Sequence, residues 1–296
     1  MRYTIRHETE YAYAEPVTMG YNAAHLRPRG GVRQRLIRHD LDVTPTPAVR
    51  HDRTDYFGNT ATYFTIQDWH TRMIVGSTAE VEVTPTAALM LAVSPPWETV
   101  RDHVRAARTA DGLDAFAMSF ESPMCPESAD VRSYAEQSFT PGRPILEAAA
   151  DLTARIFREF DYDPATTTVA TPLDQAFAQR SGVCQDFAHV FIACVRSMGL
   201  PCRYVSGYLR TFHDPGQRLI GADATHAWAS VYSEALGWVD FDPTNNQIPS
   251  EQHITIAWGR DFGDVSPVKG LILGGGDHAV EVRVTVTPET GDGGAA

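Results

Sequence analysis

Residues 181–189 read Ser-Gly-Val-Cys-Gln-Asp-Phe-Ala-His, and this stretch decides the fold. A helix is expected to begin at or near Cys184, because Gly182-Val183 ends a turn and apolar residues then recur at helical spacing up to the Gly-Leu-Pro stop at 199–201. A cysteine at the N-terminus of a helix feels the positive end of the helix dipole, which favours the thiolate. The free backbone N–H groups there can also bind a developing oxyanion. The stretch therefore indicates a nucleophilic thiol.

Two motifs downstream supply the groups that such a thiol needs. Residues 225–228 read Thr-His-Ala-Trp, and residues 238–244 read Trp-Val-Asp-Phe-Asp-Pro-Thr. His226 opens a predicted strand and Asp242 closes the next one, so a short hairpin would set the carboxylate beside the imidazole. Asp240 lies on the same predicted face and is the rival for this place. A thiol, an imidazole and a carboxylate are the components of a nucleophile activated by an oriented base.

Composition narrows the class of protein. The chain has 296 residues, of which 43% are hydrophobic and 21% charged, as in a soluble globular protein of one large or two modest domains. A net charge of −12 argues against a nucleic-acid binder and against adhesion to an anionic membrane. We find neither a signal-peptide pattern nor an uninterrupted apolar run of about 18 residues, so we expect a cytoplasmic protein that does not bind membranes.

The four cysteines show no metal-type spacing, and His and Asp residues are scattered. We therefore expect no metal ion, no cofactor and no disulfide.

The chain divides into three predicted parts. Residues 1–90 alternate polar and apolar side chains, as at 78–83, and predict an antiparallel β domain. Residues 91–144 contain Pro- and Gly-rich breaks and predict a connector with short helices. Residues 145–288 predict helices followed by strands, with a closing strand near 280–286. The expected class is α+β, with the β domain preceding the catalytic core.

These motifs resemble the transglutaminase-like superfamily. The resemblance is carried over about residues 145–275 by Gly182-Val183-Cys184-x-Asp186-Phe187-Ala188, Arg203-Tyr204-Val205-Ser206-Gly207-Tyr208, His226-Ala227-Trp228, Gly237-Trp238 and Asp242-Pro243-Thr244. The N-terminal stretch, with Leu26-Arg27-Pro28-Arg29 and Phe57-Gly58-Asn59, is similar to the β domain that precedes this core in bacterial members.

The resemblance implies a papain-like core in which Cys184 is the nucleophile, His226 the base and Asp242 the third member of a triad. It also implies that no calcium or other metal is needed. The implied activity is acyl transfer from an amide through a thioester, and the partner is a peptide, a protein or an amide-containing small molecule. We expect a peptidase or amidase, which uses water as the acceptor.

Two alternatives stay open. A primary amine as acceptor would make the protein a transglutaminase, and a degenerate site would make it a non-catalytic peptide-binding module. Four residues are expected on the substrate side: Trp228, Gln185, Tyr208 and Arg260. For Trp228, filling the core is the alternative, and for Arg260 it is an ordinary loop ion pair. The natural substrate and the oligomeric state cannot be predicted from the sequence.

Overall fold

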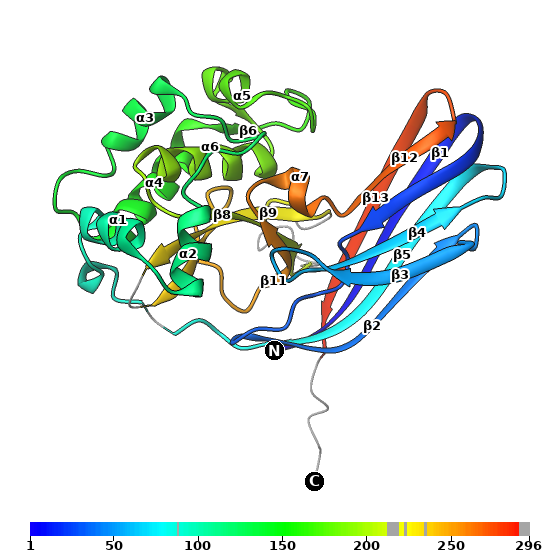
Figure 1. Ribbon diagram of the computed structural model, residues 1–296, viewed down its shortest axis with the longest axis horizontal. Coiled ribbons are helices and arrows are strands. Elements are labelled where there is room, and N and C mark those ends of the chain that lie inside the picture. The colour runs from blue at the N-terminus through cyan, green and yellow to red at the C-terminus, as the bar shows by residue number, and fades with distance from the viewer. Residues whose placement is uncertain (88, 212–218, 222–223, 234–235, 290–296) are drawn as a thin grey trace, which may run out of the picture.

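The computed structural model describes residues 1–87, 89–211, 219–221, 224–233 and 236–289. A curved antiparallel sheet lies on one side of the molecule and a layer of helices on the other, with a smaller sheet between them (Figure 1). This arrangement confirms the expected α+β class with an N-terminal antiparallel β domain.

The long first strand organises the β domain. Strand β1 (Arg2–Ala24) pairs with β5 and β13 through its first half and with β4 and β12 through its second half. Alternate side chains of β1 from Tyr3 to Thr9 are buried, as the alternating sequence pattern requires. The other strands of this sheet are β2 (Gln34–Thr44), β3 (Val49–Thr54), β4 (Thr60–Ile66), β5 (His70–Val83), β12 (Val268–Gly274) and β13 (His278–Pro288).

The last two strands differ from the expected domain division. Both β12 and β13 pair with β1, so residues 268–288 complete the N-terminal sheet, whereas the sequence placed them with the catalytic core. Val284 and Val286 bury their side chains. Alternation predicted the strand near 280–286, but it carries no information on which sheet a strand joins.

Residues 91–144 form part of the helical layer. Helix α3 packs against α6, and the buried side chains of Val100 and Val131 join the same hydrophobic cluster as α6. The helices of the layer are η1 (Leu91–Val93), α1 (Trp97–Ala106), α2 (Ala110–Ala117), α3 (Ala129–Glu136), α4 (Ile145–Glu159), α5 (Leu173–Gln179) and α6 (Cys184–Ser197).

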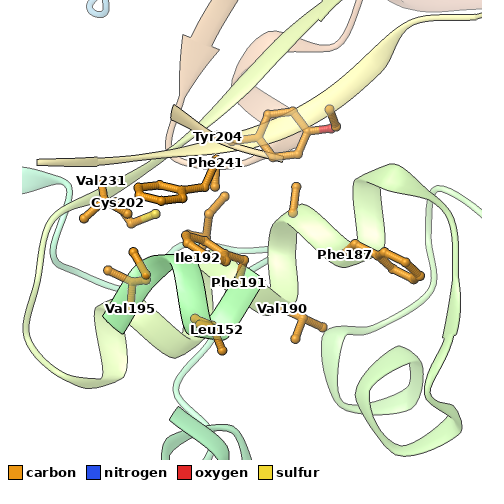
Figure 2. Close-up of a cluster of buried hydrophobic side chains, with 14 of the residues drawn as sticks. Leu152, Phe187, Val190, Phe191, Ile192, Val195, Cys202, Tyr204, Val231 and Phe241 are labelled. Carbon is orange, nitrogen blue, oxygen red and sulfur yellow. The ribbon is translucent and has the colours of Figure 1, made fainter. Parts of the chain in front are cut away.

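The central sheet carries the motifs downstream of the cysteine. Its strands, in the order β10-β9-β8-β11, are β8 (Cys202–Leu209), β9 (His226–Ser233), β10 (Gly237–Phe241) and β11 (His253–Gly259). One face of this sheet packs on α6. Figure 2 shows Ile192 and Phe191 of the helix lying against Phe241 and Cys202. The remaining elements are β6 (Asp161–Tyr162), β7 (Ser181–Gly182) and α7 (Phe262–Val265).

Strand β11 joins the two halves of the molecule. It pairs with β8 along one edge, and side chains of the β domain bind its main chain. Asn59 Nδ2 donates to the Trp258 carbonyl at 2.8 Å, and the Trp258 N–H donates to Asn59 Oδ1 at 3.0 Å. The Arg29 guanidinium stacks on the Trp258 ring at 3.5 Å. The position of β11 therefore depends on the β domain.

No helix of the described residues is long and apolar enough to span a membrane.

Candidate active site

The helix that begins at Cys184 is fixed at its first turn. Asp186 Oδ2 accepts hydrogen bonds from the Val183 N–H at 2.8 Å and from Thr167 Oγ1 at 2.7 Å, which satisfies one of the free donors at the helix start. A Cβ atom at Gly182 would lie 2.5 Å from the same carboxylate oxygen, so only glycine fits there. Local packing thus places the thiol at the N-terminal end of the helix, as the sequence predicts.

Cys184 differs from the other three cysteines in its surroundings. Its side chain is 8% exposed, whereas Cys125, Cys194 and Cys202 are at most 1% exposed. Burial raises the pKa of the Cys125 thiol to about 12, and it raises the pKa values of the Cys194 and Cys202 thiols well above their ordinary value. Among the four cysteines, Cys184 is therefore the most exposed to solvent.

His226 and Asp242 form a buried pair. His226 Nε2 lies 2.9 Å from Asp242 Oδ2, and both side chains are fully buried. Burial alone would lower the pKa of His226, but the Asp242 carboxylate and the Cys184 sulfur raise it to about 10. Burial would likewise raise the pKa of Asp242, but the His226 imidazole and its other hydrogen-bond donors hold it far below its usual range. The carboxylate is therefore ionised, and His226 donates Nε2–H to it.

The second nitrogen of His226 is left for the thiol. Nδ1 is buried and has no hydrogen-bond partner within the described part of the chain. Since Nε2 is taken by Asp242, the interaction with Cys184 falls to Nδ1. Hydrogen bonds between catalytic groups are often loose before substrate binds. Gly221 closes over this nitrogen, because a Cβ atom there would lie 2.6 Å from Nδ1.

The carboxylate that binds His226 belongs to Asp242 and not to its rival Asp240. Asp240 is opposite Ser230 in the β10–β9 ladder, and Arg33 of the β domain approaches its carboxylate at 3.9 Å. Asp242 follows the last residue of β10, where the main-chain N–H groups of Thr244 and Asn245 donate to its Oδ1 at 3.0 and 3.2 Å. These contacts turn Oδ2 toward His226.

Sequence reasoning missed one residue of this buried network. His253, the first residue of β11, places Nε2 at 3.1 Å from Asp242 Oδ2, so two imidazoles share one carboxylate oxygen. Asn245 Nδ2 donates to the same oxygen at 2.9 Å. No strand was predicted at residues 253–259; the available signal was a histidine directly before the β-branched run Ile254-Thr255-Ile256.

Two of the residues expected on the substrate side are in the interior. Trp228 is fully buried, with its ring edge-on to His253 at 5.3 Å, so the core-filling alternative holds. The Tyr208 hydroxyl hydrogen-bonds His7 Nδ1 of β1 at 2.9 Å, in the contact between the β domain and the core. Both side chains are buried, and the β domain covers Tyr208 through His7.

Of the other two expected substrate residues, Gln185 is buried and Arg260 is exposed. Gln185 follows Cys184 in the first turn of α6 and directs Nε2 at the Val169 carbonyl at 3.4 Å. It stays a prediction as a substrate contact. Arg260 makes two hydrogen bonds of 2.9 Å with the Asp264 carboxylate, which matches the loop ion pair rather than a free binding group.

The donor atoms of His226, Asp242 and His253 all lie within 4.8 Å of one another, a spacing that a divalent ion could bridge. Both Nε2 atoms, however, already donate to the carboxylate at hydrogen-bond distances. An ion at this point would have to replace both bonds. We therefore assign the three side chains to a hydrogen-bonded network.

Two family models match the chain and confirm the resemblance that the sequence motifs carry. The model of the bacterial transglutaminase-like N-terminal region matches residues 3–82, which include most of the β domain. The model of the transglutaminase-like superfamily matches residues 132–243, which include Cys184, His226 and Asp242.

Two of the following three similar proteins span nearly the whole chain, and one spans about a third of it. An uncharacterized protein of Mycobacterium tuberculosis is 40% identical over 98% of this chain and 94% of its own length. The protein-glutamine gamma-glutamyltransferase of Pseudomonas aeruginosa is 29% identical over 36% of this chain and 19% of its own length. The crystal structure of a candidate cysteine protease from Cytophaga hutchinsonii superposes with a TM-score of 0.76 at 21% identity, over 99% of this chain and 92% of that one, and thus shares the fold.

Proposed function

The chain belongs to the transglutaminase-like superfamily, and on this premise we propose that it is a thiol acyl-transfer enzyme that acts on amide bonds through Cys184, His226 and Asp242. The observation that carries the proposal is the buried His226 imidazole. One of its nitrogens is bound to Asp242, and the other is left for a thiol at the start of a helix. This is the arrangement that an activated nucleophile with an oriented base requires.

The first half of the reaction follows from these positions. The raised pKa of His226 favours transfer of the Cys184 proton to Nδ1 before substrate binds, and the thiolate then attacks the amide carbonyl carbon. The Cys184 backbone N–H, free at the helix start, donates to the oxyanion. When the C–N bond breaks, the imidazolium returns its proton to the departing amine, and a thioester at Cys184 is left. Asp242 keeps the imidazole in the required tautomer throughout.

The second half decides the class of enzyme. His226 again acts as the base and takes a proton from water or from an amine, which then attacks the thioester and frees the thiol. We propose that water is the principal acceptor, which makes the protein a peptidase or amidase. For an amine to react with the thioester faster than water does, the site must both exclude water and hold the amine in line. The likeness to a candidate cysteine protease agrees with this proposal at the level of the fold.

Transfer to a primary amine is the second candidate. It is favoured by the partial match to the protein-glutamine gamma-glutamyltransferase of Pseudomonas aeruginosa. A non-catalytic peptide-binding module is less favoured, because the thiol, the base and the carboxylate are all present.

An electrophilic probe for cysteine hydrolases, followed by a peptide and amine library, tests the proposed function. We expect intact-mass analysis to show one probe adduct on the wild-type protein and none on the Cys184→Ala variant. We also expect product from at least one amide substrate in the wild-type reaction alone. Turnover that survives in Cys184→Ala would contradict the proposal.

A further inference from the structure

The Asp242 carboxylate binds more groups than a triad accounts for. Oδ2 accepts from His226 Nε2 at 2.9 Å, from Asn245 Nδ2 at 2.9 Å and from His253 Nε2 at 3.1 Å. His253 is 3% exposed, and its Nδ1 is buried without a hydrogen-bond partner in the part of the chain that the structure describes. The one hydrogen bond that the His253 ring makes is therefore directed at the catalytic carboxylate.

We propose that His253 is a positioning residue, which shares the Asp242 carboxylate with His226, orients it, and limits how tightly it holds the base. The inference rests on the function proposed above, in which His226 is the general base. His253 itself touches neither the thiol nor the reacting atoms in this scheme.

The hydrogen bond from His253 changes the charge that Oδ2 presents to His226. Each hydrogen bond to a carboxylate oxygen stabilises the ionised form and makes that oxygen a weaker acceptor for the next donor. With His253 in place, Oδ2 divides its charge between two imidazoles. Without it, the carboxylate would bind the His226 imidazolium more strongly, and the base would be less ready to release its proton to the leaving amine.

Packing holds the two imidazoles apart at fixed positions. The Trp228 ring lies edge-on to His253 at 5.3 Å between ring centres and 6.1 Å from His226. Gly207 makes room for that indole, since a Cβ atom there would lie 2.3 Å from the Trp228 ring. The buried tryptophan therefore supports the pair of histidines, which explains its place in the interior.

The β domain fixes the strand that carries His253. Gln34 Nε2 donates to the Thr255 carbonyl at 2.7 Å, and the Thr255 N–H donates to Gln34 Oε1 at 2.8 Å. Asn59 makes the same pair of bonds with Trp258. Each amide side chain thus binds the main chain of β11 as a neighbouring strand would. A register shift in the β11–β8 ladder lies between Thr255 and Ala257, next to the first of these contacts. In this scheme the β domain acts on catalysis by placing β11.

The test measures the titration of His226 directly. Among the described residues, the titratable groups that face its ring are Cys184 from α6, Asp242 after β10 and His253 from β11. In a Cys184→Ala background the thiol is removed, and NMR of the imidazole nitrogens reports the remaining interactions. His253→Phe keeps a ring against Trp228 but removes the donor, whereas His253→Gln returns an N–H near the place of Nε2.

We expect His253→Phe to raise the pKa of His226 by about one pH unit and His253→Gln to leave it within roughly 0.3 of the parent. With Cys184 restored, His253→Phe should lower the rate of acyl transfer about tenfold, and His253→Gln should recover most of that loss. If His253→Phe does not fold, His253→Asn replaces it, because its amide is too short to reach Asp242.

An unchanged or lowered His226 pKa in His253→Phe would overturn the inference, as would an equal shift in His253→Gln. The titration needs no turnover, so it separates this inference from the proposed function. A protein without acyl-transfer activity would contradict the function alone, and an active protein with a flat response to His253→Phe would contradict the inference alone.

Discussion

His226 Nε2, at the start of β9, lies 2.9 Å from Asp242 Oδ2, directly after the neighbouring strand β10, and neither side chain is exposed to solvent. An imidazole and a carboxylate buried together are stable when each satisfies the other and the remaining oxygen sites are also filled. The main-chain donors after β10 and the second imidazole fill those sites. His226 and Asp242 therefore form one hydrogen-bonded unit.

Asp242→Asn is predicted to lower the rate of acyl transfer by roughly 10³- to 10⁴-fold, because an amide can donate to Nε2 and stabilise the wrong imidazole tautomer. Asp240→Asn is the matched control, since it makes the same chemical change two residues away on a side chain that faces Arg33. We expect it to change the rate less than about threefold. Steady-state rates of both variants check the assignment, and a damaging Asp240→Asn with a silent Asp242→Asn would reverse it.

The stability that the protonated His226 contributes is predicted to fall as the solution becomes alkaline. The folded-state pKa of about 10 lies above the ordinary value of 6.5. A group with a raised pKa stabilises the fold fully below its unfolded pKa and loses this contribution as the pH rises through the folded value. The difference in free energy of unfolding between wild type and His226→Gln should therefore be larger at pH 6 than at pH 10. Denaturant unfolding at both pH values checks this, and a difference that grows with pH would contradict the raised pKa.

Asn59→Ala is predicted to destabilise the protein by about 1–3 kcal/mol, because it leaves main-chain groups of Trp258 without partners at a buried position. It should also reduce the rate per folded molecule, since β11 carries His253. Asn22→Ala is the control, because Asn22 is a buried asparagine of the same domain whose Nδ2 makes no hydrogen bond to any described residue. Equal rate losses in the two variants, measured at matched folded fractions, would argue against a specific role of the β11 contact.

Hydrolysis is predicted to exceed amine transfer. A glutamine-containing acyl-donor peptide is incubated with a labelled primary amine at millimolar concentration, and mass spectrometry compares the hydrolysed with the transamidated product. Water at about 55 M competes for every thioester unless the site excludes it and binds the amine. More transamidated than hydrolysed peptide would favour the transglutaminase alternative.

The sequence predicted the parts of the site that depend on local structure. A helix start at Cys184 follows from the Gly-Val turn and the apolar spacing after it, and a hairpin between His226 and Asp242 follows from a short loop. These features involve near neighbours in the chain or motifs with few alternative geometries.

Long-range packing could not be predicted in the same way. The contact of His253 with Asp242 depends on β11 lying beside β8, and the burial of Tyr208 depends on His7 of the β domain. The pairing of β13 with β1 joins residues near the two ends of the chain. An alternating pattern shows that a strand has a buried face but not which partner covers it.

The rate of alkylation of each thiol by iodoacetamide at pH 6 shows whether Cys184 is the activated nucleophile, and it requires no knowledge of the substrate. Cys184 begins a helix, is the most exposed of the four cysteines and interacts with the protonated His226 imidazole. Burial raises the pKa of the other three thiols. We predict that peptide mapping finds Cys184 modified first in the folded protein and that His226→Ala slows this reaction. Faster modification of Cys125, Cys194 or Cys202, or a rate at Cys184 that does not depend on His226, would contradict the account.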